Sequence, residues 1–231
     1  MKKILIVVVL IAFCQEVTAQ VSVGVDLMSR KEFLKYNDPG NRIIPDPLSS
    51  FSFGALVNVG LGRDMFVETG IYSWTYTNNI ELYGPNYSIP FLSSVKSPNR
   101  FATIPVRFGY RFALDSDWKF LRKLSFSPIL GTALTMNGKD RWSKAESGNY
   151  QQSMEVNKSW NLYLEGGIRA YYPLFHNFDL MFNYSFVKGF RDFSFREVEY
   201  EDFNNEANFS TVISDGSARH WSFGLIYKIK N

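Results

Sequence analysis

Near its end the chain reads RHWSFGLIYKI over residues 219–229. Large apolar side chains occupy every second position, and small or polar side chains occupy most positions between them. The apolar set is Trp221, Phe223, Leu225, Tyr227 and Ile229, and the opposite set contains His220, Ser222, Gly224 and Lys228. Strict alternation with a period of two predicts a β-strand that has one apolar and one polar face.

Seven earlier stretches show comparable alternation, and no helical periodicity lasts longer than a turn or two. The sequence therefore predicts an all-β protein with eight strands. The seven stretches are residues 21–27, 50–61, 65–77, 102–112, 124–136, 160–172 and 178–186.

The stretch 65–77 is ambiguous about which face is apolar. Val67, Thr69 and Ile71 share one face, whereas several aromatic residues share the other face with Glu68. Two interpretations remain open. Either the aromatic side chains fill the interior beside Glu68, or a bulge near Gly70 switches the face. The aromatic residues are Phe66, Tyr72, Trp74 and Tyr76.

The connections between these strands alternate in length. Antiparallel pairing puts the three shorter connections and both termini at one end, and the four long ones at the other. Short periplasmic turns and long outer loops are typical of outer-membrane barrels. We therefore predict an eight-stranded antiparallel up-and-down transmembrane β-barrel with four long extracellular loops and periplasmic termini. The long connections are residues 30–49, 78–99, 137–159 and 190–217, and the shorter ones are 62–64, 115–123 and 173–177.

The N-terminus has the pattern of a secretory signal peptide. Lys2 and Lys3 precede an apolar run over residues 4–13, and small residues lead to a cleavage site between Ala19 and Gln20. The apolar run is about half of the roughly 20 residues that a transmembrane helix needs. We predict a signal peptide over residues 1–19 and one barrel domain over residues 20–231.

Composition limits the remaining possibilities. The chain has 231 residues, of which 45% are hydrophobic, which suits one domain with a sizeable core. Its net charge of +3 falls to +2 when Lys2, Lys3 and Glu16 leave with the signal peptide, which argues against a nucleic-acid-binding protein. Cys14 is the only cysteine, and the bulky Phe13 before it does not fit a lipidation motif. The mature domain therefore has no thiol chemistry.

The main alternative fold is a soluble lipocalin-like barrel, which has its apolar side chains inside. Three features favour a membrane barrel. Aromatic residues gather near the strand ends, the strands are about 10–13 residues long, and the polar faces carry few lysines. We therefore place the apolar faces outside, in contact with lipid.

Eight strands leave an interior that is just wide enough for side chains. We expect an interior ion-pair network, because two carboxylates can pair with three guanidinium groups on the inward faces. A structural plug is the favoured interpretation, and a proton or ion path is the alternative. The predicted network residues are Glu68, Arg107, Arg111, Glu165 and Arg169.

The mature chain resembles the small outer-membrane β-barrel family of Bacteroidota, which includes the PorT-like proteins. The resemblance rests on short motifs: residues 103–106 (TIPV), 130–132 (LGT) and the glycine pair 166–167. Because Pro105 lacks an N–H, we expect a bulge or a missing ladder bond there. The last strand resembles the signal that the barrel-assembly machinery reads, with Ser222, Gly224, Tyr227 and Ile229 at its positions. The resemblance implies an envelope location and an unassigned or accessory role, including in protein secretion, and it does not single out one activity.

Catalytic chemistry has one candidate, the His220–Ser222 pair, which has the spacing of lipid A deacylase barrels. Both side chains face the predicted interior, and no later acidic residue orients the histidine. We predict no catalytic, cofactor-binding or metal-binding residues.

The long connections carry two further groups of residues. An acidic cluster over residues 197–206 suits a solvated or partner-facing loop better than a calcium site, because it lacks the spacing of calcium loops. The loop aromatic residues either contact partners or pack the loops on one another. They are Trp142, Tyr150, Tyr200, Phe203 and Phe209.

The sequence therefore predicts a non-enzymatic outer-membrane barrel that presents loops to the outside and needs no cofactor. Its expected partners are the lipid bilayer, the barrel-assembly machinery and an envelope protein bound through the loops. The favoured role is an accessory of an envelope or secretion complex. The alternatives are a surface adhesin or envelope-stabilising barrel and, less favoured, a lipid A-modifying enzyme or a narrow pore.

Overall fold

The structure is a computed structural model that describes residues 20–45, 49–62, 64–82, 91–114, 117–137, 141–147, 150–156, 160–201 and 206–229. The predicted signal peptide, with Ala19, lies outside the described residues. Apart from the single 3-10 turn η1 (Leu121–Lys123), the regular elements of the described residues are β-strands. No helix in this part of the chain is both long and apolar enough to cross a membrane.

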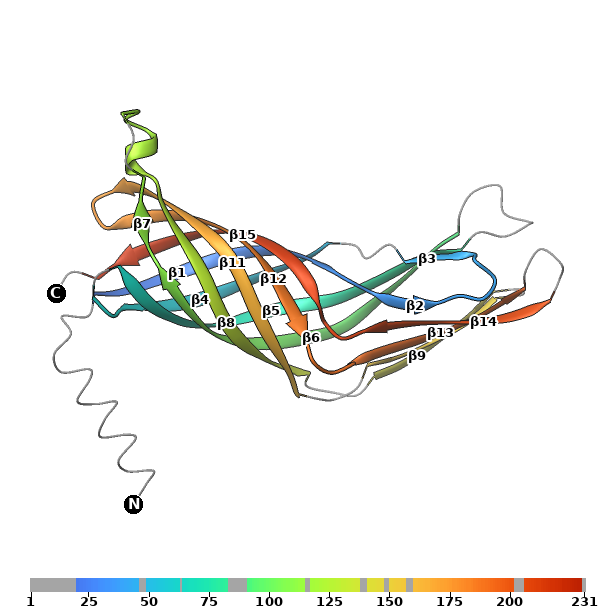
Figure 1. Cartoon of the computed structure of the whole chain (residues 1–231). Coiled ribbons are helices and arrows are strands. Elements are labelled where there is room, and N and C mark those ends of the chain that lie inside the picture. Colours follow the sequence, from blue (N-terminus) through green and yellow to red (C-terminus); the bar gives the residue numbers. More distant parts are fainter. Residues whose placement is uncertain are drawn as a thin grey trace, which may run out of the picture.

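Eight strands form a closed antiparallel barrel, as predicted (Figure 1). Each strand pairs with the barrel strand that follows it in the chain, and β15 closes the ring on β1 through pairs such as Val25 with Leu225. The barrel strands are β1 (Val21–Glu32), β4 (Ser50–Gly60), β5 (Met65–Leu82), β6 (Phe91–Tyr110), β8 (Ser125–Asn137), β11 (Trp160–Phe175), β12 (Phe178–Gly189) and β15 (Ala218–Lys228).

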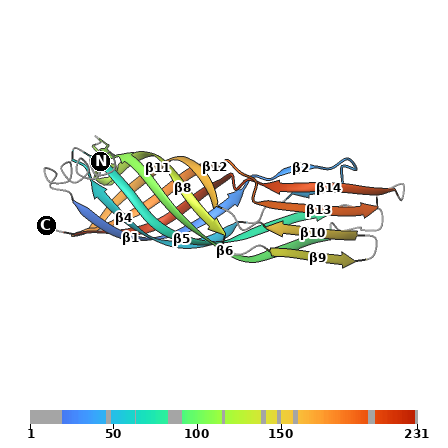
Figure 2. The same ribbon diagram turned by 90° about the horizontal axis from the view of Figure 1, so that it is seen from below.

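A second sheet of five strands continues from one end of the barrel, which we call the loop end (Figure 2). These segments lie in the long polar connections predicted from sequence, and the sequence did not predict that they contain strands. The strands, in sheet order, are β2 (Lys35–Asn37), β14 (Ala207–Ser214), β13 (Ser194–Glu201), β10 (Tyr150–Val156) and β9 (Arg141–Ser147). The short strand β3 (Ile43–Pro45) pairs with the part of β5 that extends beyond the barrel.

The opposite end, which we call the turn end, holds the start of β1, the end of β15 and the short connections (Figure 1). Two of these turns need left-handed backbone: φ is 82° at Gly62, 70° at Asp64 and 43° at His176. Glycine and aspartate adopt this conformation more readily than most residues. The connection after β6 contains β7 (Phe112–Ala113), which pairs with β8, and then η1.

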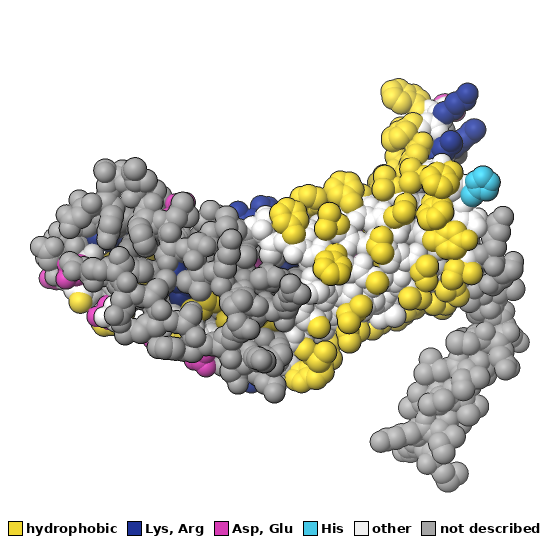
Figure 3. Space-filling view, turned by 180° about the vertical axis from the view of Figure 1, so that it is seen from behind, with side chains coloured by type: hydrophobic (Ala, Val, Ile, Leu, Met, Phe, Trp, Pro, Cys, Tyr) yellow, Lys and Arg dark blue, Asp and Glu magenta, His cyan; other side chains and the backbone are white. Residues whose placement is uncertain are grey.

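The barrel has most of its large apolar side chains outside, whereas its interior holds polar and charged side chains beside a small apolar cluster of Leu56, Tyr171, Met181 and Ile226. Phe53 is 73% exposed and Leu130 62% exposed, whereas Glu68 and Ser222 are fully buried. Hydrophobic side chains are accordingly spread over the face of the barrel wall that Figure 3 shows, with few charged side chains among them. This arrangement excludes the lipocalin-like alternative and matches a barrel whose wall faces lipid.

The structure also decides the face of β5. Phe66 and Tyr72 fill the interior beside Glu68, and Ile71 lies outside. The register shift in β5 falls between Thr75 and Thr77 rather than near Gly70. A glycine in the neighbouring strand β4 makes room for Tyr72, because any side chain at Gly54 would place its Cβ 2.4 Å from the Tyr72 ring.

Pro105 interrupts one ladder without shifting its register. The β5–β6 pairing stops after the pair Thr69–Val106 and resumes at Tyr72–Thr103 in the same register. On its other side Pro105 still pairs with Ala133 of β8. The missing ladder bond predicted at Pro105 is therefore confirmed, and the Thr69 hydroxyl donates a hydrogen bond of 2.9 Å to the Pro105 carbonyl oxygen instead.

Candidate functional site: a closed barrel interior and a folded loop end

Three barrel strands bring four of the predicted charged residues into one network inside the barrel. Arg107 Nη1 donates to Glu68 Oε1 at 2.9 Å, and Arg107 Nε donates to Glu165 Oε2 at 2.8 Å. Arg169 donates to both oxygens of Glu68, with Nη2 2.7 Å from Oε1. Each of the four residues is at most 3% exposed. Two carboxylates and two guanidinium groups balance each other, which buried charges require.

Strand register explains how residues that are distant in the chain meet. Glu68 lies directly opposite Arg107, and Gly131 pairs with Arg107 on one side and with Glu165 on the other. A Cβ at Gly131 would lie 3.0 Å from Cγ of Arg107. The glycine therefore leaves the space through which the Arg107 side chain reaches Glu165 across β8.

Arg111, the fifth predicted network residue, lies apart from the other four. Its Nη1 donates to Asp179 Oδ2 at 3.3 Å, and Lys228 Nζ lies 2.7 Å from the same oxygen. The Arg111 guanidinium also lies 3.8 Å from the centroid of the Tyr171 ring. Arg111 therefore belongs to a second ion-paired group at the turn end. The sequence prediction placed it on the correct face but with the wrong partners.

Neutral and acidic side chains that sequence reasoning missed extend the network. The Tyr72 hydroxyl donates to Asp26 Oδ2 at 3.1 Å and accepts from Arg107 Nη1 at 3.1 Å. Ser185 donates to Glu165 Oε1 at 3.0 Å, and Arg169 Nε donates to Asn183 Oδ1 at 3.3 Å. All of these residues occupy inward positions of alternating strands. The alternation indicates their face, but it does not indicate their partners.

His220 and Ser222 both point into the barrel, as expected from the strand pattern, and both are buried. The Nε2 atom of His220 lies 3.2 Å from Glu165 Oε1 and within hydrogen-bond distance of Ser185. In a catalytic triad the acid and the nucleophile contact different ring nitrogens. Here Glu165 and Ser185 share one nitrogen, so this group does not have triad geometry.

The barrel interior leaves little empty space around the network. A cavity of about 20 Å³ lies among Tyr72, Arg107, Glu165 and His220. A water molecule needs roughly 10–15 Å³ by this measure, so the cavity has room for about one. This volume is too small for a substrate.

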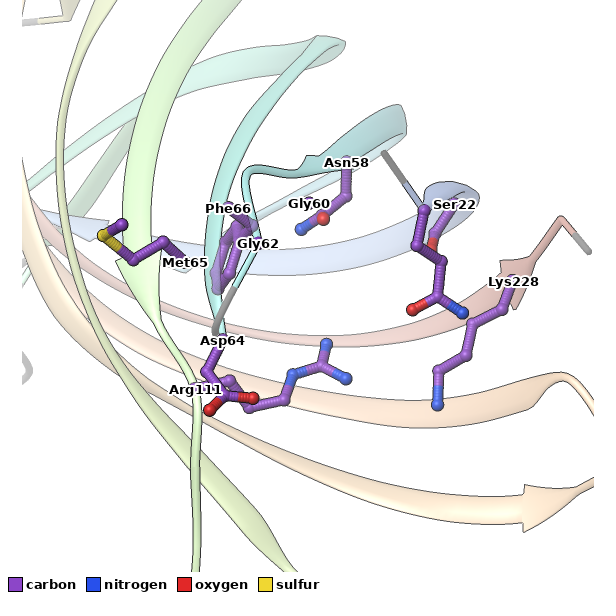
Figure 4. A pocket seen from close by; sticks show the side chains of 10 residues that line it. Ser22, Asn58, Gly60, Gly62, Asp64, Met65, Phe66, Arg111 and Lys228 are labelled. Carbon is purple, nitrogen blue, oxygen red and sulfur yellow. The ribbon is translucent and has the colours of Figure 1, made fainter. Parts of the chain in front are cut away.

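A larger pocket of about 220 Å³ opens at the turn end (Figure 4). Asn58 and the Arg111 guanidinium point into it, and Phe66 lies along its wall (Figure 4). Phe66 is followed along β5 by the buried Glu68. The pocket therefore lies at the turn end of the same interior that holds the network.

The loop end has its own buried clusters and does not consist of separate loops. One cluster joins the first, second and fourth long connections, and a second joins β6, β10 and the start of the fourth connection. The first consists of Ile43, Ile80, Val198, Tyr200 and Val212, and the second of Phe101, Met154, Val156 and Phe193. An isolated two-stranded hairpin is only marginally stable in water. The buried apolar side chains of these two clusters therefore stabilise the second sheet.

Asp38 ties the first connection to the fourth. Its carboxylate accepts hydrogen bonds from the hydroxyls of Tyr200 and Ser210 and from the backbone N–H groups of Arg42 and Ile43. Burial alone raises the pKa of Asp38, but these hydrogen bonds outweigh it, so the pKa lies below its ordinary value. Burial and the bond to Asp38 raise the pKa of Tyr200 to about 12.

The predicted loop residues fall into different environments. Tyr200 is buried and packs the sheet, whereas Phe209 is 64% exposed. Glu197, Glu199 and Glu201 alternate on β13 with buried residues, which puts them on its outer face. Among the described residues, no three His, Cys, Asp or Glu side chains are grouped so that they could hold a metal ion. The side chains of Trp142, Tyr150 and Phe203 lie outside the described part of the chain.

The four residues of the predicted assembly signal lie on both faces of β15, and Ile229 directly follows the strand. Ser222 and Gly224 lie inside, and Tyr227 and Ile229 lie outside near the turn end. A Cβ at Gly224 would meet Met181 Cε at 2.7 Å.

No family model matches the sequence, and no curated protein matches it at a significant level. Among solved structures, the outer membrane protein OprG from Pseudomonas aeruginosa matches with a TM-score of 0.54 and 13% identity, over 92% of this chain and 97% of that protein. The fold is that of an outer-membrane β-barrel. A major outer membrane protein from Thermus thermophilus matches with a TM-score of 0.51 and 12% identity, over 92% of this chain and 100% of that protein. At these identities the likeness concerns the fold alone.

Proposed function

We propose that this protein is a non-enzymatic, non-conducting barrel of the bacterial outer membrane that holds a rigid β-sheet platform for a protein partner. One observation carries the proposal. The barrel interior holds a buried ion-paired network around a cavity of about 20 Å³, while the loop end folds into a sheet with its own buried clusters. A filled interior argues against transport, and an ordered platform favours recognition.

The membrane location is supported by the apolar outer wall and by the fold. Side chains such as Phe51, Phe53 and Leu130 are more than half exposed on the barrel wall. Exposure of so much apolar surface is unfavourable in water, whereas in a membrane the acyl chains would contact it. The predicted signal peptide, assembly by the barrel-assembly machinery and periplasmic termini complete this proposal. In that orientation the platform faces outward.

The platform suits a protein partner because it is already ordered before binding. The hydrogen bonds of Asp38 and the two buried clusters hold its strands in place. A pre-organised surface loses less conformational entropy on binding than flexible loops do. An accessory subunit of an envelope or secretion complex, as in the PorT-like group that the chain resembles, is the role that we favour.

The decisive experiment is a mild-detergent pull-down of the tagged protein from native outer membranes, with partners identified by mass spectrometry. A stoichiometric envelope protein is the expected result, and it should be lost when the exposed Phe209 of the platform is replaced by Ser. Recovery of the barrel alone would contradict the accessory role. Binding of whole cells to host or matrix ligands would then favour the adhesin alternative, which the exposed Tyr36 and Phe209 also suit.

A further inference from the structure

A short segment at the turn end, residues 117–124, carries exposed aromatic and cationic side chains next to one another. We call it the η1 segment. Trp118 is 73% exposed and Phe120 59% exposed. Lys119, Arg122 and Lys123 are also exposed. Large aromatic side chains that are exposed together on a turn indicate an interaction surface, because exposing them to water is unfavourable.

The η1 segment is held in a fixed position on the barrel wall. The backbone N–H of Arg122 donates to the Trp118 carbonyl oxygen at 3.0 Å, and that of Leu114 donates to the Leu124 carbonyl oxygen at 3.3 Å. The Phe120 ring stacks on Tyr172 of β11 with a centroid distance of 5.2 Å. Tyr172 follows the buried Tyr171 and belongs to the outer face of the barrel. The aromatic surface of the segment is therefore continuous with the apolar wall.

The two kinds of side chain lie on opposite sides of the segment (Figure 3). The segment projects sideways from the barrel wall near the turn end. Its hydrophobic side chains face the apolar wall, and its Lys and Arg side chains face away toward the turn end. Three cations accompany one carboxylate, Asp117, in residues 117–124. Apolar rings toward the acyl chains and cations toward the headgroups are the arrangement of an interfacial membrane anchor.

The geometry points to anionic phospholipid headgroups of the leaflet at the turn end as the partner of the η1 segment. In this inference Lys119, Arg122 and Lys123 contact lipid phosphates, and Trp118 and Phe120 insert at the boundary between headgroups and acyl chains. The inference rests on the proposed function, since it requires that the barrel spans a membrane. A soluble protein is the poorer fit, because it would have to displace lipid to reach rings that face the wall. Each cation near an anionic surface favours anionic over neutral lipid by about fivefold.

The test uses the full chain folded into vesicles of phosphatidylcholine and phosphatidylglycerol. Lipids brominated on their acyl chains quench tryptophan on contact, and subtraction of the Trp118→Phe variant isolates the Trp118 signal. We expect brominated phosphatidylglycerol to quench Trp118 with a relative association constant at least about fivefold above that of brominated phosphatidylcholine. The variant K119Q/R122Q/K123Q should lower this ratio to about one, and the three single variants should lower it in steps.

The matched control is Arg219→Gln, which removes an exposed cation of β15 toward the loop end and should leave the ratio unchanged. In about 1 M salt the screening length is about 3 Å. This salt should lower the ratio of the two association constants for the parent protein but not for K119Q/R122Q/K123Q. An unchanged ratio in K119Q/R122Q/K123Q, in a barrel that still migrates differently with and without boiling, would overturn the inference alone. A chain that does not enter vesicles at all would overturn the proposed membrane function, and this inference with it.

Discussion

Replacement of Glu68 by Gln should destabilise the barrel strongly, because the carboxylate is the centre of the interior network. Glu68 is fully buried and accepts hydrogen bonds from Arg107 and from both terminal nitrogens of Arg169. The amide keeps the shape of the side chain but leaves one buried positive charge without compensation. Loss of one partner of a buried ion pair costs about 3–5 kcal/mol, a factor of roughly 10²–10⁴ in the unfolding equilibrium.

Urea unfolding of the refolded barrel in detergent micelles, followed by tryptophan fluorescence, measures this change. Glu197→Gln is the matched control, because Glu197 is exposed on β13 and its loss should change the free energy of unfolding by less than about 0.5 kcal/mol. Replacement of Glu68, Arg107, Glu165 and Arg169 together by Met should cost less than Glu68→Gln, since the two positive and two negative charges that are removed cancel one another. A loss of less than about 1 kcal/mol for Glu68→Gln would refute the reasoning, because it would mean that water screens the network.

Three further predictions concern the interior, the packing of β5 and the loop end. Planar-bilayer recordings of the parent protein should show no steady conductance, because an eight-stranded barrel leaves room for side chains only and the buried ion-paired residues occupy that room. Stable single-channel steps would contradict this. Gly54→Val should lower the free energy of unfolding by about 1–3 kcal/mol, because its Cβ would lie 2.4 Å from the Tyr72 ring, while Ala55→Val on the outer face should be nearly neutral. The lowered pKa of Asp38 stabilises the loop end above the ordinary pKa of an aspartate, and this stabilisation is lost as the pH falls through the lower folded-state value. Proteolysis of the loop end should therefore accelerate in acid for the parent protein, whereas Asp38→Asn should be cleaved faster at neutral pH and show little further change on acidification.

The period-two pattern was sufficient to predict the barrel because each barrel strand separates a lipid-facing from an interior face. The alternation in 219–229 reappears in β15 with Trp221, Phe223 and Leu225 outside and His220 and Ser222 inside. The second sheet was missed because its strands do not have a purely apolar face. On β13 the glutamates 197, 199 and 201 resemble a solvated loop, while Val198 and Tyr200 on the other face are too few to indicate a strand on their own.

The interior site could be predicted by face but not by partner. Glu68 and Arg107 are opposite one another in neighbouring strands, so a correct register would have paired them. Arg111 forms an ion pair with Asp179, which lies 68 positions away in the chain. The alternation in the two strands gives the face of each residue, but it is equally consistent with other partners. Asp38 was missed because its Asn-Asp-Pro-Gly context indicates a turn, whereas its role depends on Tyr200 and Ser210 from the fourth connection.

The distribution of charge over the molecule links these observations to function. Inside the barrel the charges of the four network residues neutralise one another. At the loop end Asp38 uses its four hydrogen bonds to join its own turn to β13 and β14. The side chains left for recognition are outward ones such as Glu197, Glu199 and Phe209. Acidic side chains along β13 together with exposed aromatic residues favour partners that offer cations and apolar pockets, because complementary charge speeds encounter and aromatic contacts slow dissociation. If a partner is captured, basic residues should therefore line its contact surface, and raised salt should slow association more than it speeds dissociation.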